Sequence, residues 1–389
     1  MSDSKNGFGI IFRRTWVSIV RNPVCWMGFF LLPLFCFLFL TSMMEDGLPT
    51  KVPAAIIDKD GTSLSREVSR TLAGMQMVDI EAIPESYTDA RQLVQEGKIF
   101  GFFLIPENFQ SELLSGRKPV ITFYTNMTYY VPASLLFKTF KATALYSKAG
   151  IAVQVIQQVG YTENVTPLLN PVSVSTRPIG NPWLNYGIYL CNSFIPGVLQ
   201  VMIFLMTCYT LGMEIKHGQS RRLLQLADGS VLKALTAKLL PQTIIWTVIA
   251  LFMEAWLFKF NHFPMNGSWL WITLSQLMFV LAAQGFALFI FAILPNLRLS
   301  LSVSALIGIL SFSIAAFSFP VESMYGAIGI FSWILPVRYN FLIYVDQALN
   351  GIDIFYSRYW FVAYIIFMLI PLPFLTRIKR AFADQVYVP

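Results

Sequence analysis

Residues 186–212 read YGIYLCNSFIPGVLQVMIFLMTCYTLG and contain no charged side chain. An α-helix rises about 1.5 Å per residue, so about 20 residues cross the roughly 30 Å hydrocarbon core of a bilayer. This segment is long enough to cross it, and an uncharged apolar run of this length is typical of a transmembrane helix. It therefore predicts a membrane protein rather than a soluble one.

The composition of the whole chain agrees with this interpretation. Hydrophobic residues make up 56% of the 389 residues and charged residues only 13%, whereas soluble domains contain roughly 25% charged residues. A single soluble globule is therefore excluded. The 34 Phe, 16 Tyr and 9 Trp residues also exclude a disordered chain.

Other segments have the same length and apolar character. The five further predicted spans are residues 24–41, 239–257, 269–294, 299–319 and 359–375. A seventh apolar stretch, residues 321–335, is too short to cross and is followed at once by Pro336 and Arg338. We interpret it as re-entrant or interfacial, within an outer segment at residues 320–350. The candidate functional residues of that segment are Pro320, Glu322, Pro336 and Arg338.

Lys and Arg residues beside the spans indicate the orientation, because they resist translocation across a membrane. Thirteen of them lie before span one, between spans two and three, between spans four and five, and after span six, whereas three lie in the alternate short loops. Both termini are therefore expected in the cytoplasm, and residues 42–183 outside it. This asymmetry explains most of the net charge of +7, so no nucleic-acid partner is predicted.

The first span has two interpretations. Its basic flank and apolar run fit a cleaved signal peptide, but the run is longer than a usual signal core and residues 40–44 lack a small-x-small cleavage site. A retained anchor, residues 24–41, is the favoured interpretation. Residues 8–20 place their apolar side chains on one helical face, which predicts a cytoplasmic interfacial helix within residues 1–23; a plain cytoplasmic tail is the alternative.

Residues 42–183 have the composition and pattern of a soluble α/β domain. Strands are predicted at residues 53–57, 77–82, 99–105 and 120–124, and helices at 62–73, 86–96 and 107–114. This alternation indicates βαβ units and a small mixed sheet, and a helical stretch at residues 131–160 follows. The predicted fold class is an α-helical membrane protein with six transmembrane helices, plus an α/β extracytoplasmic domain inserted between helices 1 and 2. Helices 2–6 fall in residues 184–389.

The sequence offers little catalytic chemistry. It contains no GxxxxGK[ST] phosphate loop, and its two histidines, His217 and His262, lie on opposite sides of the membrane in the predicted topology. We therefore predict no catalytic residues and no metal site, with a metal at the Asp58–Gly61 turn as a minor alternative. The cysteines all lie in predicted spans, so they supply no disulfide framework: Cys25, Cys36, Cys191 and Cys208.

Four local motifs, taken in order, resemble one family. They are EIKHGQSRRLLQL (214–226) followed by KLLP (238–241); FSFPVESM (317–324); LPVRY (335–339) with ALNG (348–351); and IDKD (57–60) with GFFLIPENF (101–109). Together they resemble the membrane subunit of a type-2 ABC exporter, in particular the long subfamily with a large periplasmic domain between spans one and two. The chain departs from that pattern at Gln219-Ser220, where Gly-Thr is commoner, and at Ala237-Lys238, where Gly-Lys is usual.

The resemblance implies a permease subunit in the bacterial inner membrane that is not an enzyme by itself. Its expected partners are cytoplasmic ABC ATPase subunits, which would hold ATP and Mg, a second permease copy or a sibling permease, the lipid bilayer, and a periplasmic membrane-fusion adaptor. The expected function is outward movement of a hydrophobic or amphipathic substrate, such as a drug or lipid. The alternative is a mechanotransmitting subunit that relays ATPase motion to the periplasmic domain without passing cargo through its spans.

The resemblance also implies a cytoplasmic coupling segment at residues 213–238. A short amphipathic helix there would dock its leucines into a groove on the ATPase. We expect Glu214 to pair with Lys216, Arg221 or a basic group of the ATPase; an ordinary basic loop is the plain alternative. The predicted coupling residues are Glu214, Lys216, Arg221, Arg222, Leu223, Leu224 and Leu226.

Polar residues inside the spans are candidates for a translocation pathway, because polar groups in hydrocarbon should face the protein interior or a water-filled path. The candidates are Asn192, Gln200, Glu254, Gln276 and Gln284. Glu254 is the only carboxylate that we place in a span, and snorkelling with Lys259 is the alternative explanation for it. The amides have the alternative of bonding across helices, and Pro196 is expected to kink span two.

Overall fold

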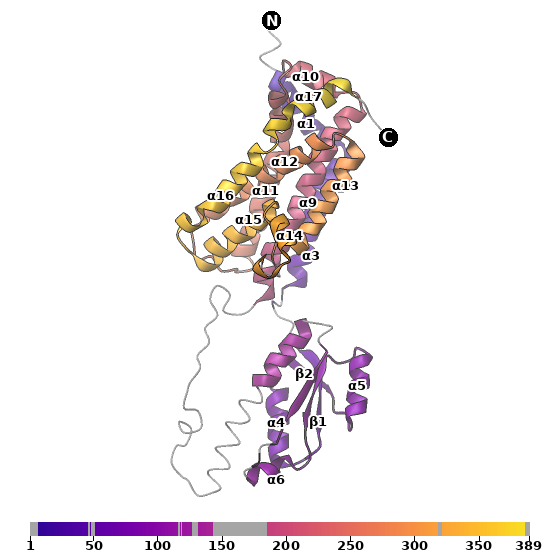
Figure 1. Ribbon diagram of the computed structural model, residues 1–389, viewed down its shortest axis with the longest axis vertical. Coiled ribbons are helices and arrows are strands. Elements are labelled where there is room, and N and C mark those ends of the chain that lie inside the picture. Colours follow the sequence, from indigo (N-terminus) through magenta and orange to yellow (C-terminus); the bar gives the residue numbers. More distant parts are fainter. Residues whose placement is uncertain are drawn as a thin grey trace. The chain divides into compact units, whose positions relative to one another are not determined.

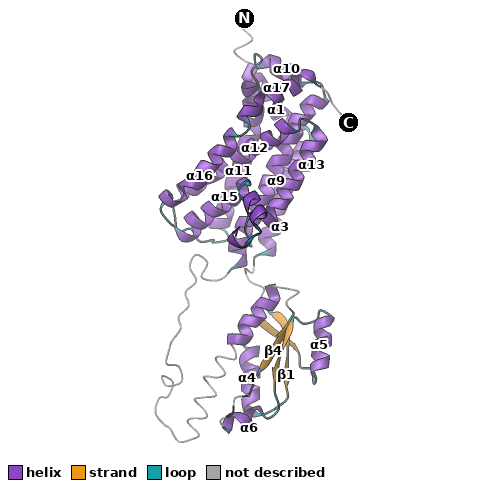
Figure 2. Ribbon diagram, viewed as in Figure 1, coloured by secondary structure: helices purple, strands orange, loops and turns teal. Residues whose placement is uncertain are grey.

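The computed structural model describes residues 7–45, 47, 51–115, 117, 119–126, 131–142, 185–317 and 321–385. The chain divides into two compact units, residues 48–177 and residues 1–47 with 178–389. The second of these is helical, and the first contains a sheet and its covering helices (Figures 1 and 2). We describe each unit by itself.

The helical unit contains the predicted spans. Four of them are continuous helices: α9 (Tyr186–Lys216), α11 (Val231–Lys259), α12 (Trp269–Ile293) and α13 (Leu297–Ile314). The first span, Pro23–Met43, consists of α2 (Pro23–Trp26), a π-helical turn (Met27–Leu31) and α3 (Leu32–Met43). The last consists of α16 (Ile354–Leu369), a 3-10 turn (Leu372–Phe374) and α17 (Leu375–Asp384). Within the described residues six helices are thus long and apolar enough to cross a membrane.

Polar side chains fix where the long helices begin. Asn185 accepts a hydrogen bond from the backbone N–H of Gly187 at 2.7 Å, and Ser230 accepts one from that of Lys233 at 3.3 Å. Such caps satisfy N–H groups that have no partner inside the helix. Because Ser230 caps α11, this helix begins eight residues before the predicted start at residue 239. Helix α13 ends earlier than predicted, at Ile314 rather than at residue 319.

The core of the helical unit lies around α9, which packs against α12 and α13. Small residues allow close approach where helices cross. A side chain at Gly285 of α12 would meet the backbone oxygen of Phe367 in α16, and one at Gly308 of α13 would meet Val201 of α9. Membrane helices associate mainly through such close packing, since lipid is as apolar as their side chains.

The seventh apolar stretch forms a broken helix pair. A 3-10 turn (Val321–Ser323) precedes α14 (Gly326–Ser332), and α15 (Pro336–Ile343) continues into a π-helical turn (Tyr344–Asn350). The two helical parts are bent by 77°. Pro336 occupies the first turn of α15, where a missing N–H costs nothing. Of the predicted outer residues, Pro320 and the side chain of Glu322 lie outside what the structure describes.

The other unit contains a four-stranded sheet in the order β2-β1-β3-β4. Its strands are β1 (Val52–Asp58), β2 (Val78–Ala82), β3 (Gly101–Ile105) and β4 (Thr122–Thr125). Strand β1 runs parallel to β2 and β3, whereas β4 is antiparallel to β3. Each strand predicted from the sequence therefore has a counterpart, and the sheet is mixed.

Helices α4 (Ser63–Ala73), α5 (Tyr87–Gln95) and α6 (Phe109–Leu114) accompany the sheet, and residues 131–142 are also helical. The rest of the predicted helical stretch at 131–160 lies outside the described residues. Thr62 and Ser86 cap α4 and α5. In the Asp58–Gly61 turn, the Asp58 carboxylate accepts hydrogen bonds from the backbone of Asp60 and Gly61 at 3.0 Å. One oxygen, Oδ1, accepts both of these bonds, and the other, Oδ2, accepts from the Ser65 hydroxyl of α4 at 2.7 Å. Both oxygens therefore already bond to the turn and to the beginning of α4.

The close crossing at Gly285 can be tested by the smallest possible change. A Cβ there would lie 2.4 Å from the Phe367 oxygen, whereas one at Gly326 would have no atom within 4 Å. We expect Gly285→Ala to lower the melting temperature in detergent, because overpacking costs about 1–3 kcal/mol. The control Gly326→Ala should leave it unchanged or raise it, because Ala favours a helix by about 0.5–1 kcal/mol. Equal melting temperatures for both variants would contradict the packing.

Candidate functional site: an ion triad beside a short surface helix

The segment after α9 folds into α10 (Ser220–Leu226). Helices α1 (Gly7–Arg21), α10 and α17 gather at one end of the helical unit (Figure 1), and α10 packs against both of the others. The predicted coupling segment at 213–238 is therefore not one element. Its first residues belong to α9, and residues from Val231 onward belong to α11.

The C-terminal helix holds α10 in place. The Ser220 hydroxyl donates to the backbone oxygen of Phe382 at 2.8 Å, and the Arg221 Nε donates to that of Ala383 at 2.5 Å. The Gln385 side chain donates to the oxygen of Gly218 at 2.8 Å. The first two bonds satisfy carbonyl groups at the end of α17 that have no helical partner, whereas the third is accepted by the loop before α10. They also tie the α9–α10 loop to the last helix of the chain.

The leucines of α10 face inward, which corrects one prediction. Leu223 is 1% exposed and Leu224 is 8% exposed, and both belong to the core of the helical unit. Leu226 is half-buried against the same core. The apolar face of this amphipathic helix is thus covered by the chain's own helices, so it is not available to dock into a groove of a partner. The exposed side of α10 carries Arg221, Arg222 and Gln225 instead.

A second correction concerns Glu214, in the last turn of α9. Its carboxylate lies between two basic groups from other helices: the Lys238 Nζ of α11, at 2.6 Å from Oε1, and the Arg14 guanidinium of α1, which contacts Oε2. We expected Lys216, Arg221 or a partner group; in the structure Lys216 and Arg221 are exposed, and the ion pairs of Glu214 are with Arg14 and Lys238. Glu214 and Lys238 are only 7% and 5% exposed. We call Arg14, Glu214 and Lys238 the ion triad.

The ion triad joins three helices, and Arg14 extends the link to a fourth element. Arg14 also donates to the Gln219 side chain at 2.8 Å, in the loop before α10. One turn further into the unit, the Gln242 amide of α11 donates to the Thr210 hydroxyl of α9 at 2.9 Å. A cavity of about 120 Å³ adjoins these groups. Because a buried charge without its partner is costly, the triad fixes α1, α9 and α11 in one arrangement.

Helix α1 itself has a narrower buried face than the apolar pattern indicated. Its buried residues are Gly7, Ile11, Thr15 and Ile19, four residues apart, and they pack toward α10 and α11. Apolar residues of the predicted interfacial face, such as Trp16 and Val20, remain exposed. Arg14 is half-buried and reaches Glu214 of α9. The sequence signalled Arg14 only as one of the basic residues that set topology.

The structure brings three of the five pathway candidates together. Asn192 of α9, Glu254 of α11 and Gln276 of α12 line one small cavity beside Pro196. The Gln276 amide donates to the Glu254 carboxylate at 3.2 Å. Glu254 is buried, whereas Lys259 is exposed; the structure thus gives Glu254 an interior partner rather than the snorkelling lysine. The cavity has about 20 Å³, which is room for roughly one water molecule.

The other two candidates bond across helices. The Gln200 carbonyl oxygen accepts from the backbone N–H of Val337 at 2.8 Å, and its amide donates to the Ser311 hydroxyl at 3.3 Å. The Gln284 oxygen accepts from the Thr243 hydroxyl at 2.7 Å. Both side chains therefore act in helix association. Gln200 also satisfies an N–H at the buried beginning of α15.

Arg338 of the outer segment is buried rather than exposed. Its guanidinium donates to the backbone oxygen of Ala315, just after α13, at 3.3 Å and lies 4.4 Å from the ring centroid of Trp333. A cation near the last carbonyls of a helix is favourable. Arg338 thus joins the broken helix pair to the end of α13. Among the described residues, no hydrogen bond or ion pair connects Arg338 with the ion triad.

These features define a membrane protein with several spans and a polar, ion-paired end. The comparison with protein families then identifies it more closely: residues 24–374 match the model described as ABC-2 family transporter protein. The chain belongs to the ABC-2 transporter family, which confirms the resemblance to a type-2 ABC permease. No curated protein matched it. Permeases of this family are membrane subunits that work with an ABC ATPase subunit.

The ion triad predicts an asymmetry between two substitutions. Glu214→Gln leaves Lys238 buried without an anion, whereas Lys238→Met leaves Glu214 with Arg14. Breaking a buried pair costs about 3–5 kcal/mol, so Glu214→Gln should lower the melting temperature more than Lys238→Met, and the double variant should be less harmed than the sum of the two.

The exposed ion pair of Asp228 and Lys233 provides a matched control. Exposed pairs contribute about 0–1 kcal/mol, so the corresponding cycle with Asp228→Asn and Lys233→Met should show almost no coupling. The structural role of the triad would be contradicted if the melting-temperature shifts of Glu214→Gln and Lys238→Met were additive and as small as those of the control pair.

Proposed function

We propose that this chain is the permease subunit of an ATP-driven ABC exporter in a bacterial inner membrane, and that it moves a hydrophobic or amphipathic substrate outward. The observation that carries the proposal is the arrangement at the α10 end. A short helix with an exposed basic side is linked through Gln219 to the ion triad, which joins three helices of the helical unit. Family membership supplies the energy source, a separate ABC ATPase.

The exposed side of α10 is the proposed contact surface for the ATPase. Arg221, Arg222 and Gln225 are exposed there, and Lys216 and His217 extend the surface at the end of α9. Among the described residues, Arg222 has no hydrogen bond or ion pair within this chain, so its charge is free for an acidic partner group. Nucleotide and Mg would be held by the ATPase and not by this chain.

Movement at α10 has a direct route into the spans. Gln219 binds Arg14, and Arg14 binds Glu214 of α9, which in turn binds Lys238 of α11. A displacement of α10 by the ATPase would therefore move α1, α9 and α11 jointly, as one body. This is the rigid-body type of transition, in which packed elements move as units.

The substrate route is proposed to form between two permease copies or a copy and a sibling permease. The cavity at Glu254 has only about 20 Å³, so it does not admit an amphipathic molecule in this state. The same observation favours the second candidate function, in which the spans transmit ATPase motion to the α/β unit and a periplasmic adaptor without carrying cargo.

In the proposed orientation, both termini and α10 are cytoplasmic and the α/β unit is periplasmic. Labelling with a membrane-impermeant maleimide tests this in a Cys36→Ala background, in which the remaining native cysteines are buried. Ile83→Cys is on the α/β unit, where residue 83 is 76% exposed, and Gln225→Cys is on the exposed side of α10. Intact spheroplasts should label position 83, and position 225 only after permeabilisation. The reverse pattern would overturn the orientation.

A charge reversal on α10 tests the contact surface. With the ATPase reconstituted beside the permease, Arg222→Glu should reduce the permease-dependent stimulation of ATP hydrolysis at least several-fold, because an acidic partner group would then face a like charge. The melting temperature should not change, since Arg222 is exposed. Lys259→Glu, a charge reversal at another exposed position, at the end of α11 away from α10, is the control. Full stimulation by Arg222→Glu would show that the ATPase binds elsewhere.

A further inference from the structure

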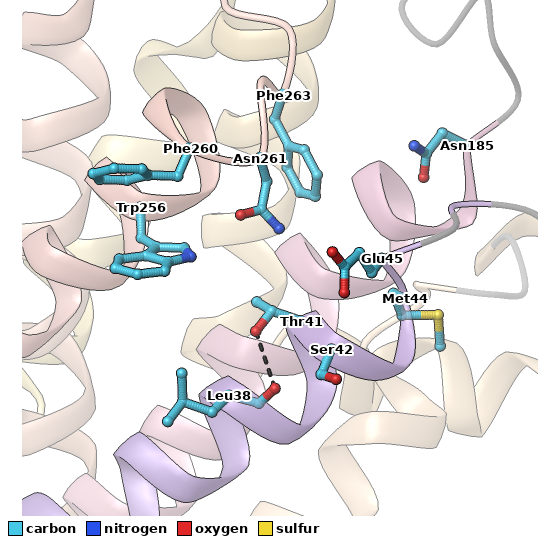
Figure 3. Close-up of a pocket in the computed structure, with 10 residues that line it drawn as sticks. All are labelled: Leu38, Thr41, Ser42, Met44, Glu45, Asn185, Trp256, Phe260, Asn261 and Phe263. Carbon is cyan, nitrogen blue, oxygen red and sulfur yellow. Dashed lines mark hydrogen bonds between the residues drawn. The ribbon is translucent and has the colours of Figure 1, made fainter.

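A pocket of about 520 Å³ lies at the opposite end of α9 from α10. Its walls come from the last turns of α3, from Asn185 at the beginning of α9, and from the end of α11 with the loop after it (Figure 3). All of its lining residues belong to the helical unit. It is separate from the Glu254 cavity, with which it shares no lining residue.

One wall of the pocket is aromatic. The rings of Trp256 and Phe260 lie side by side with centroids 4.7 Å apart, and Phe263 borders the same space. Phe260 is 62% exposed, so this wall is accessible. The face of an aromatic ring carries partial negative charge and attracts cations, most strongly for Trp.

The opposite wall carries a carboxylate. Glu45 lines the pocket, and its carboxylate points toward the space that it shares with Asn261 (Figure 3). Within the described part of the chain, this carboxylate has no hydrogen bond or ion pair. Other polar groups of the lining are already engaged: the Thr41 hydroxyl donates to the Phe37 oxygen at 2.8 Å, and the Asn185 oxygen caps α9.

The charged side chain that lines the pocket is negative, and no basic side chain opposes it. None of its ten lining residues is Lys, Arg or His. A carboxylate facing aromatic rings attracts a cation from both sides, whereas it repels an anion. An exposed carboxylate by itself is no sign of a binding site, because water satisfies it in any loop. Here the aromatic wall opposite the carboxylate adds a second attraction, and it favours a cation that has an apolar body.

The position of the pocket adds an apolar approach. Leu38 of α3 is 48% exposed and Phe252 of α11, one turn before Trp256, is also 48% exposed. Helix α11 and the Pro23–Met43 segment that contains α3 are each long and apolar enough to cross a membrane. The surface beside the pocket is thus of the kind that faces lipid, and a ligand could keep an apolar part in the bilayer while its charge enters the pocket.

We propose that this pocket binds the cationic group of an amphipathic molecule, with the cation between Glu45 and the Trp256–Phe260 wall and the apolar part along α3 and α11. This goes beyond the proposed transport function, because it concerns binding alone. It needs neither ATP nor the ATPase, so transport could fail while binding holds, and the reverse.

Equilibrium dialysis of radiolabelled tetraphenylphosphonium against the purified full-length chain tests the site. Dodecyl maltoside micelles are suitable because they are neutral and contain no ammonium group. Glu45→Gln should weaken binding about tenfold, and Trp256→Leu several-fold. Glu85→Gln, the same change at an exposed carboxylate outside the pocket, should bind like the wild type.

Tetraphenylborate, which has nearly the same shape and the opposite charge, separates charge recognition from apolar partitioning. Its binding should not weaken in Glu45→Gln. The proposal is overturned if Glu45→Gln binds tetraphenylphosphonium as the wild type does, or if it loses both ions equally. Melting temperatures of the variants show whether a loss reflects unfolding; Glu45 is exposed, so no shift is expected.

Two sources could supply the cation, and both fit the proposal. Phosphatidylethanolamine added to the micelles should compete with tetraphenylphosphonium if the natural occupant is the ammonium of a lipid headgroup. Unchanged binding in its presence would instead assign the site to a free lipophilic cation.

Discussion

A single buried carboxylate determines how one end of this molecule is built. Glu214 is almost fully enclosed, and a charge in such a place is tolerated only with paired partners. Arg14 and Lys238 supply them from two other helices. Lys238 cannot leave Glu214 without becoming a buried charge that has lost its anion, and Arg14 adds a second ion pair from α1. Helices α1, α9 and α11 are therefore held in one arrangement, and α10 joins them through Gln219. The surface helix and the spans are therefore one mechanical body at this end.

A related constraint acts where helices break inside the unit. Backbone groups cannot remain unpaired away from water, so irregular backbone in a membrane protein needs side-chain partners. The beginning of α15 is satisfied by Gln200 of α9, and the end of α13 by Arg338. The Tyr344 hydroxyl donates to the Ile188 oxygen in the first turn of α9 at 3.0 Å. The bent helix pair is thus stabilised by polar residues, although a hydropathy profile shows such residues only as interruptions of an apolar segment.

Sequence reasoning predicted the elements well and their partners poorly, for a physical reason. Hydropathy and strand–helix alternation are local properties, so the spans and the strands could be located from short windows. Arg14 and Glu214 are 200 residues apart, and no local pattern states that they meet. The leucines of α10 show the same limit: an amphipathic helix reveals that it has an apolar face, but not whether its own chain or a partner covers that face.

The cross-links between α9 and α11 bear on what an ATPase could move. Lys238 binds Glu214, and one turn away Gln242 binds Thr210, so the two helices are joined by a charged and a neutral bond on the same side. Neither helix can slide past the other at this end without breaking both. Further along α9, Pro196 lacks the N–H that would pair with the Asn192 oxygen, and both residues line the Glu254 cavity. In the proposed coupling, a displacement entering at α10 would travel as a rigid motion of the α9–α11 pair up to the proline, where α9 has lost a backbone hydrogen bond. The small cavity lined by Asn192, Glu254 and Gln276 lies beside this proline, so a bend of α9 there would change the packing around the Glu254 carboxylate.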